Sequence, residues 1–448
     1  MTTFPLQYSG EKRGYAPIQR KCHLENLKNN QRATAITVLT EILENGAYTN
    51  IALRKALAKA PHNKQANAFV TELVNTTIRN LILIDHIIDS FSNADELKPI
   101  IRNILRISVC QLRFIERVPS YTAVDEAVKL ARAYGFERLA GFVNGILRGI
   151  DREPNKPAFS QKDLVIRYSY PSWLVNSLVK WLGAKGAAEF CENSHRPAQI
   201  TVLPNTCKTD AARLIAALEA EDVTVTPIEG SPMLALRNTG NIAALSAFKD
   251  GLFIVADPGI MAAIDALGLQ QGQTLIDLCA APGGKSFAAA VSVNNKARIL
   301  AFDIYPHKLE LLNQQQKRLG LSIIETKIND ALVFGPALAG LADAVLVDAP
   351  CSGLGTLRHH AEIKYTRQPE DILDLAKKQA VMLARAARYV KKGGALVYCT
   401  CTVAREENFD VIDKFMQSHP NFSLATANQI LPSEYSDGFF TAKMCRNA

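Results

Sequence analysis

Residues 274–285 read Thr274-Leu275-Ile276-Asp277-Leu278-Cys279-Ala280-Ala281-Pro282-Gly283-Gly284-Lys285. An apolar run, a turn of small residues and the start of a helical pattern follow one another here, which predicts a strand, a tight turn and a helix. Small residues let the backbone approach a ligand closely, and amides at a helix start can bind a carboxylate. A generic tight turn is the alternative interpretation. The spacing is not the G-x-G-x-x-G of a dinucleotide site, which disfavours NAD.

Four further apolar runs follow this stretch, at 297–302, 322–328, 343–348 and 394–399, with helical patterns between several of them. Regular alternation of this kind predicts a doubly wound parallel sheet, so we expect an α/β domain over residues 256–448. Ligands of such sheets bind outside the carboxyl ends of the strands. The residues that end each run are therefore the candidate site.

Acidic residues end three of these runs. Asp303 follows the second, Asp330 comes just after the third, and Asp348 ends the fourth. An acid at the end of the second strand can accept hydrogen bonds from both hydroxyls of a ribose. Each acid alone is more typical of a helix cap or a solvated loop than of a ligand site. Together, beside the glycine-rich turn, they predict an adenosine ligand that carries a sulfonium.

Two cysteines follow neighbouring strands of the predicted sheet. Cys351 lies just after Asp348, and Cys401 follows the fifth run. A thiolate that adds to carbon 6 of cytosine activates carbon 5 toward an electrophilic methyl group, and a second group must then remove the carbon 5 proton. Asp348 is expected to hold the cytosine ring. Buried structural cysteines are one alternative, and a Cys-x-Cys redox or zinc role is another, although no second metal-spaced pair accompanies it.

The chain before residue 256 divides into three parts. Helical spacing of apolar residues predicts an all-helical domain over 32–152, and a polar, proline-containing linker follows it. Mixed patterns over 158–255 predict a small α+β segment, with helices near 173–182 and 211–219 and strands near 200–203 and 222–226. Residues 1–31 form a basic N-terminal arm, which either attracts phosphate backbones or is a solvated tail.

Bulk properties set the broad class. The 448 residues suggest about two to four domains, and their composition is that of a soluble globular protein. No stretch is long and apolar enough for a membrane span or a secretory signal, and the nine cysteines are not spaced as a disulfide framework. We therefore expect a cytoplasmic protein, without a metal and by default monomeric. The formal net charge is +8, and the first 32 residues contribute half of it.

At this point the motifs match a known family. The chain resembles, over nearly its whole length, the bacterial 16S ribosomal RNA cytosine-5 methyltransferases with a NusB-like N-terminal domain. The likeness is carried by 277–285, by Asp348-Ala349-Pro350-Cys351-Ser352-Gly353, by Thr400-Cys401 followed by Glu406-Glu407-Asn408, and by 437–443. In the helical domain it is carried by Arg32-Ala33-Thr34-Ala35 and Phe142-Val143-Asn144-Gly145-Ile146-Leu147-Arg148.

The resemblance implies a role for each candidate residue. The segment from Cys279 to Lys285 would wrap S-adenosylmethionine, and Asp303, Asp330 and Asp348 would line the same site. Cys401 would be the nucleophile, and Cys351 would assist release of the product. The helical domain would dock RNA, or it would be a packing module. The substrate would be 16S rRNA, free or partly assembled.

Three stretches depart from the family pattern. Gln-Asp-x-Ala-Ser-Gln is replaced by Ala256-Asp257-Pro258-Gly259-Ile260-Met261, Leu-Arg-x-Asn by Ile200-Thr201-Val202-Leu203, and Arg-His-Pro-Asp by His359-His360-Ala361-Glu362 or a shifted version. All three are expected on the RNA side. They leave open the same chemistry on transfer RNA, or a non-catalytic RNA-binding or assembly factor with a vestigial methyltransferase domain.

Overall fold

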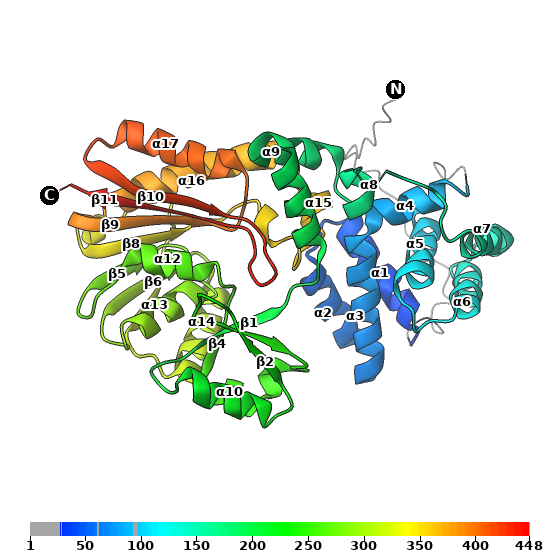
Figure 1. Ribbon diagram of the computed structural model, residues 1–448, viewed down its shortest axis with the longest axis horizontal. Coiled ribbons are helices and arrows are strands. Elements are labelled where there is room, and N and C mark those ends of the chain that lie inside the picture. Colours follow the sequence, from blue (N-terminus) through cyan, green and yellow to red (C-terminus); the bar gives the residue numbers. More distant parts are fainter. Residues whose placement is uncertain (1–26, 28, 61, 93–96, 161, 448) are drawn as a thin grey trace. The chain divides into compact units, whose positions relative to one another are not determined.

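The computed structural model describes residues 27, 29–60, 62–92, 97–160 and 162–447 (Figure 1). Most of the predicted basic arm, 1–26 and 28, lies outside the described residues. The chain forms two compact units, which are described separately below. Among the described residues, those of the smaller unit lie within 27–41, 50–77 and 87–156, and those of the larger within 42–49, 78–86 and 157–447. Within the described part of the chain, no helix has both the length and the apolarity to cross a membrane.

The N-terminal third is helical, as predicted. Its α-helices are α1 (Gln31–Leu43), α2 (Thr49–Lys59), α3 (Lys64–Arg79), α4 (Leu81–Asp89), α5 (Pro99–Phe114), α6 (Ser120–Ala133) and α7 (Ala140–Arg152), and a 3-10 turn, η3 (Glu137–Leu139), precedes α7. Helix α5 packs against α6 and α7 and is buried along most of its length. Its first residue is Pro99, which costs nothing there because that position has no intrahelical N–H bond to lose. Helix α5 is therefore central to the packing of the smaller unit.

The middle segment is a small α+β layer, also as predicted. It contains α8 (Leu164–Tyr168), α9 (Ser172–His195), β1 (Ile200–Pro204), α10 (Ala211–Glu219), β2 (Thr224–Pro227), β3 (Leu234–Arg237), η4 (Ile242–Ala244), α11 (Ser246–Lys249) and β4 (Phe253–Val255). The strands pair antiparallel in the order β2-β3-β1-β4. Helix α9 extends well beyond the predicted 173–182 and kinks at Gly183, where φ is 72°.

The C-terminal part contains a seven-stranded sheet in the order β10-β11-β9-β8-β5-β6-β7. Its strands are β5 (Thr274–Asp277), β6 (Arg298–Asp303), β7 (Ile324–Ile328), β8 (Ala342–Asp348), β9 (Val390–Thr400), β10 (Phe422–Ile430) and β11 (Phe439–Arg446). The five predicted strands run parallel. Strand β11 pairs antiparallel with β9, and β10 pairs antiparallel with β11. The prediction of a purely parallel sheet missed these two strands.

Helices cover both faces of this sheet (Figure 1). They are α12 (Ile260–Leu267), α13 (Gly284–Ser292), α14 (Pro306–Leu319), α16 (Pro369–Ala387) and α17 (Phe409–Ser418); shorter turns are η5 (Pro336–Leu338), η6 (Leu354–Thr356), α15 (Ile363–Thr366) and η7 (Arg405–Glu407). Neighbouring strand residues face opposite sides, so Leu275 packs in the α12–α14 core and Ile276 in the α16–α17 core. With both faces buried, functional side chains are left to the strand ends.

A close backbone contact fixes the loop after β9. The Gly355 amide donates to the Cys401 carbonyl at 2.9 Å, and the Gly438 amide donates to the Gly355 carbonyl at 3.0 Å. A Cβ added at Gly355 would lie 2.0 Å from the Gly438 carbonyl oxygen. Position 355 therefore requires the absence of a side chain.

Gly355→Ala should destabilise the larger unit by about 1–3 kcal/mol, because the added methyl group forces these backbones apart. Both tryptophans, Trp173 and Trp181, lie in α9 of that unit, so the fluorescence change in urea reports its unfolding. Gly335→Ala is the control, since the nearest atom to its added Cβ is 3.7 Å away. Equal unfolding midpoints for the two variants would contradict the role given to Gly355.

Candidate active site

The predicted site residues gather at the carboxyl ends of adjacent parallel strands. Strand β8 lies between β5 and β9 and pairs with both in parallel, with Asp348 beside Cys399. Asp303 ends β6, on the other side of β5. Cys351 and Cys401 follow the neighbouring strands β8 and β9, as the sequence predicted.

The two thiols face each other. The Sγ atoms of Cys351 and Cys401 are 3.1 Å apart, and the backbone amide of Cys401 donates to the Cys351 sulfur at 3.3 Å. The hydrogen bond to Cys401, together with burial, raises the pKa of Cys351 well above its ordinary value. Cys351 therefore keeps its proton at neutral pH.

A buried glutamate supports the Cys351 loop. Glu407 is fully buried, and its Oε2 accepts hydrogen bonds from the Ser352 amide at 2.8 Å and from Gln379 Nε2 at 2.8 Å. The same Gln379 amide donates to the Pro350 carbonyl at 3.0 Å. Burial raises the pKa of Glu407. Glu407 belongs to a motif quoted above, but its supporting role was not predicted, because its partners are 28 and 55 residues away in the chain.

Asn408 holds the backbone on both sides of Cys401. Its Oδ1 accepts from the Thr400 hydroxyl at 2.6 Å, and its Nδ2 donates to the Thr402 carbonyl at 3.0 Å. The Thr402 hydroxyl in turn contacts the Ser352 hydroxyl at 2.8 Å. All of these side chains are buried, where a well-satisfied network is rigid. The position of Cys401 is therefore fixed from both neighbours.

Lys285 forms an ion pair within the site. Its Nζ lies 2.7 Å from Asp348 Oδ2 and 5.0 Å from the centre of the Phe439 ring. Burial alone would lower the pKa of Lys285, but the neighbouring Asp348 carboxylate raises it above its ordinary value. The sequence analysis placed Lys285 only in the cofactor-binding turn. The structure also joins its ammonium group to Asp348, beside the cysteines.

The turn between β5 and α13 bridges the neighbouring strands. The Leu278 amide donates to the Leu346 carbonyl at 3.0 Å, and the Ala280 amide donates to the Phe302 carbonyl at 2.8 Å. Gly283 has a φ of 112°, which favours glycine, and a Cβ there would collide with Phe287. A Cβ at Gly284 would meet nothing within 4 Å. The backbone at the start of α13 therefore faces open space.

Asp277 lies buried beneath this turn. Its Oδ2 accepts from the Ser286 hydroxyl at 2.6 Å, and its Oδ1 accepts from the Cys279 amide at 3.4 Å. Burial raises the pKa of Asp277 to about 7. This aspartate was not among the predicted site residues. Its contacts join the end of β5 to the first turn of α13.

Four aspartates surround the turn electrostatically. Burial, and then the negative charges of Asp277, Asp348, Asp303 and Asp330, raise the pKa of Cys279. Asp303 is nearly buried, and its Oδ1 accepts from the Tyr305 amide at 2.9 Å. Asp330 is exposed, and its Oδ1 accepts a hydrogen bond from the Leu332 amide at 2.8 Å. Open backbone ringed by carboxylates fits a cationic ligand with a ribose. No group of His, Cys, Asp or Glu able to hold a metal occurs among the residues described.

Two of the departing stretches meet beside Asp437. Asp257 Oδ2 accepts from the Asp437 amide at 2.8 Å, while the Asp437 carboxylate lies 3.2 Å from Arg358 Nε and 3.5 Å from His359 Nε2. Arg358 is buried and also donates to the carbonyl of Glu434 at 3.2 Å. The cluster fixes the loop that carries Gly438. Sequence spacing gave no signal for it, because its members are far apart in the chain.

Family comparisons match three parts of the chain. The 16S rRNA methyltransferase RsmB/F family matches residues 264–445, the NusB family matches 29–152, and the RsmF/B-like ferredoxin-like domain matches 170–242. Among curated relatives, the probable ribosomal RNA small subunit methyltransferase B of Bacillus subtilis is 34% identical over 93% of this chain and 99% of its own length. The ribosomal RNA small subunit methyltransferase B of Proteus mirabilis is 30% identical over 92% of this chain and 98% of its own length.

Two solved structures share the fold. The crystal structure of the protein PH0851 covers 93% of this chain and 98% of its own, with a TM-score of 0.77 and 27% identity. The crystal structure of NSun6 from Pyrococcus horikoshii with SFG covers 62% of this chain and 99% of its own. Its TM-score is 0.57 and its sequence identity is 20%. The second likeness concerns the fold alone.

Asp277→Asn should flatten the dependence of stability on pH. The folded pKa of about 7 lies above the ordinary value of 3.8, so between those values the folded chain binds more protons than the unfolded chain, and stability falls as pH rises. Asparagine does not titrate, so the variant should lose less stability between about pH 4 and 7.

Tryptophan fluorescence in urea at several pH values measures the effect. Asp437, whose pKa burial also raises to about 7, retains its own contribution, so the slope should shrink and not vanish. Asp265→Asn, an exposed change in α12 of the same unit, is the control. An unchanged slope in Asp277→Asn would contradict the burial argument.

Proposed function

The chain belongs to the 16S rRNA methyltransferase RsmB/F family of S-adenosylmethionine-dependent enzymes, and on this premise we propose that it methylates carbon 5 of a cytosine in 16S rRNA through a covalent cysteine adduct. The observation that carries this proposal is the contact of the Cys351 and Cys401 sulfurs at 3.1 Å. Beside them lies the ion pair of Lys285 and Asp348. The chemistry at carbon 5 requires a nucleophile and a base, and the two thiols can supply both.

The reaction proceeds in three stages. Cys401 Sγ adds as a thiolate to carbon 6 of the cytosine, which makes carbon 5 nucleophilic. Bound S-adenosylmethionine would supply the electrophilic methyl group to carbon 5, with its sulfur keeping the electron pair of the broken bond as the neutral thioether of S-adenosylhomocysteine. Cys351, after releasing its own proton to solvent, takes the carbon 5 proton, the bond between carbon 6 and Cys401 breaks, and the electron pair returns to the Cys401 sulfur. The methylated base leaves with both thiols restored.

The surroundings of the two sulfurs support this division of roles. In the free enzyme Cys351 is held in its protonated form, chiefly by its hydrogen bond to Cys401, so Cys351 is the poorer nucleophile. When the Cys401 sulfur bonds to carbon 6, that hydrogen bond weakens and its effect on the Cys351 pKa declines. Cys351 can then release its proton to solvent and act as a base, at the stage where a base is needed.

The ion pair of Lys285 and Asp348 supports a role in holding the base. Asp348 ends β8, which pairs with β9, the strand that Cys401 follows. Asp348 also lies only three residues before Cys351. Its carboxyl group would hold the cytosine at the ring nitrogen and exocyclic amine, while the bond from Lys285 to Oδ2 fixes its orientation. A cytosine held by its ring nitrogen and exocyclic amine would present its carbon 6 to Cys401.

The cofactor residues are assigned from the same strand ends. The turn from Cys279 to Gly284 would line S-adenosylmethionine with backbone, and Asp303 would accept hydrogen bonds from the ribose hydroxyls. Asp330 and Asp348 would add negative charge facing the sulfonium. The open space beside Gly284 and the carboxylates around Cys279 support this assignment.

The RNA must expose its target base. Removing a paired base from a helix costs a few kcal/mol, so free or partly assembled 16S rRNA suits this site better than a folded helix. The protein is expected to act as a monomer in the cytoplasm.

Cys401→Ala should abolish methyl transfer, and Cys351→Ala should accumulate a covalent protein–RNA adduct, because attack remains possible while proton removal does not. Transfer is measured with labelled S-adenosylmethionine and small-subunit RNA, and the adduct is seen as a shifted band that resists denaturant. Peptide mapping should place the RNA on Cys401.

Cys207→Ala is the matched control, since this cysteine is exposed and lies in the same unit. It should retain activity and form no trapped adduct. Activity retained in Cys401→Ala would overturn the nucleophile, and an adduct mapped to another cysteine would overturn the division of roles.

A further inference from the structure

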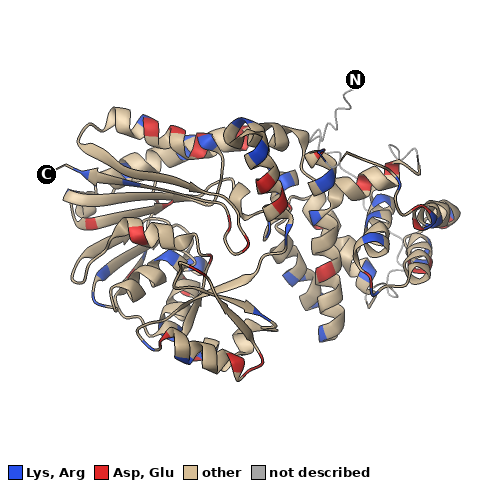
Figure 2. Ribbon diagram, in the orientation of Figure 1, with Lys and Arg blue, Asp and Glu red and all other residues tan. Residues whose placement is uncertain are grey.

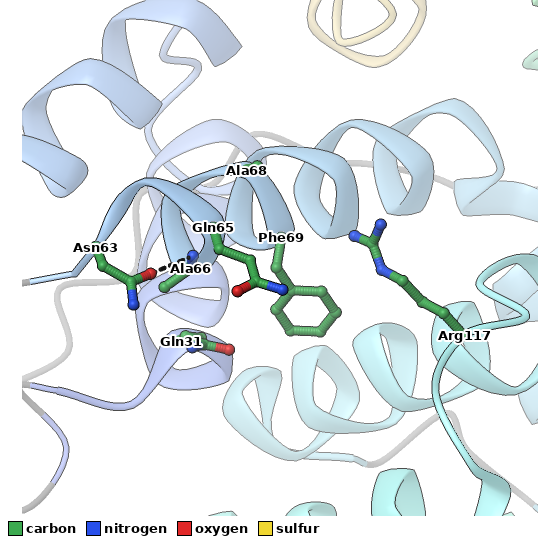
Figure 3. Close-up of a pocket in the computed structure, with 7 residues that line it drawn as sticks. All are labelled: Gln31, Asn63, Gln65, Ala66, Ala68, Phe69 and Arg117. Carbon is green, nitrogen blue, oxygen red and sulfur yellow. Dashed lines mark hydrogen bonds between the residues drawn. The ribbon is translucent and has the colours of Figure 1, made fainter.

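The smaller unit contains a pocket of about 320 Å³, separate from the strand-end site (Figure 3). It opens between the first turn of α1, the start of α3 and the segment after α5. The lining residues are Gln31, Asn63, Gln65, Ala66, Ala68, Phe69 and Arg117. Its volume is at the lower end of the roughly 300–1,000 Å³ usual for small-ligand sites, which suits one planar ring system and not a dinucleotide.

Phe69 and Arg117 line this pocket, and Arg32 lies outside its lining but close to the Phe69 ring. The guanidinium carbons of Arg32 and Arg117 lie 5.3 and 5.9 Å from the centre of the Phe69 ring. Phe69 is half-buried, so part of its surface stays accessible. An accessible aromatic ring flanked by arginines is the arrangement on which unpaired bases stack in single-stranded nucleic acid complexes.

Amide side chains add polar groups around the ring. Gln65 lies one helical turn before Phe69 on α3, so both project from the same face, and Gln31 reaches the pocket from α1 (Figure 3). Asn63 caps α3 through its Oδ1, which accepts from the Ala66 amide at 2.9 Å. A glutamine amide both donates and accepts hydrogen bonds, which matches the edge of a nucleobase.

Both arginines have acidic neighbours. Arg117 forms an ion pair with Glu72, and Arg32 interacts electrostatically with Glu126 while its Nε donates to Gln111 at 2.8 Å. Basic and acidic positions are interspersed along the helices of this unit in the view of Figure 2. This unit therefore offers RNA a defined pocket for one base and not a uniformly basic surface.

We propose that this pocket binds a single unpaired base of the RNA substrate, stacked on Phe69 beside Arg117, with Gln31 and Gln65 contacting the base edge. The basic arm adds to this argument by its place in the sequence, because it is joined directly to Gln31, which lines the pocket. The inference rests on the proposed RNA substrate.

Binding of a fluorescein-labelled, single-stranded RNA of about ten nucleotides to the full-length protein tests the proposal by anisotropy. Phe69→Leu keeps an apolar side chain but removes the stacking surface, and should weaken binding by about 5- to 50-fold. An RNA of the same length with abasic positions should bind both proteins equally. Gln65→Ala, at an exposed position, should weaken binding several-fold with less risk to folding.

Tyr121→Leu is the matched control, because it removes a 72% exposed ring from α6 of the same unit and should leave RNA affinity unchanged. Circular dichroism melting checks that each variant folds. Wild-type affinity in both Phe69→Leu and Gln65→Ala would overturn the proposal, and so would an equal loss on abasic RNA. The anisotropy assay measures RNA binding without methyl transfer. Its result therefore does not depend on the chemistry proposed for Cys351 and Cys401, which the cysteine variants test separately.

Discussion

The contact between the Cys351 and Cys401 sulfurs depends on the parallel pairing of β8 with β9. Their register sets Asp348 beside Cys399, so the chain leaves both strands at the same edge of the sheet. Two loops 50 residues apart in sequence then present their sulfurs at 3.1 Å. A register shift of one residue would turn the side chains of one strand to the opposite face and separate them. The burial of both faces of β8 and β9 in two different cores makes such a shift costly.

The loops themselves are held by buried polar groups, and this is where the site costs stability. Glu407, Asn408 and Gln379 are all fully buried and hydrogen-bonded to loop backbone. Burying such groups is unfavourable unless their partners are in place. Their hydrogen bonds hold the two loops, and with them the two thiols, in place in the folded protein. Around them, Lys285 offsets part of the negative charge that four aspartates place at the turn between β5 and α13.

Much of this could be predicted from the sequence because the signals are local. Apolar runs ending in Asp303 and Asp348 indicated strands β6 and β8, and the order of runs placed Cys351 and Cys401 after neighbouring strands. The antiparallel strands β10 and β11 were missed, since β10 is largely exposed and lacks a continuous apolar run. The Asp437 cluster and the support from Glu407 were also missed. Both depend on contacts across large sequence separations, which no spacing rule reports.

Oxidative cross-linking of the native protein tests the central geometry most directly. Mild treatment with diamide, followed by digestion and mass spectrometry without reduction, identifies which cysteines lie within bonding reach. The account predicts one disulfide, between Cys351 and Cys401, that is reversed by a thiol reductant together with recovery of methyl transfer. A link from either cysteine to Cys279 or Cys399 instead, or no link under conditions that oxidise exposed Cys207, would contradict the convergence of these two sulfurs on one base.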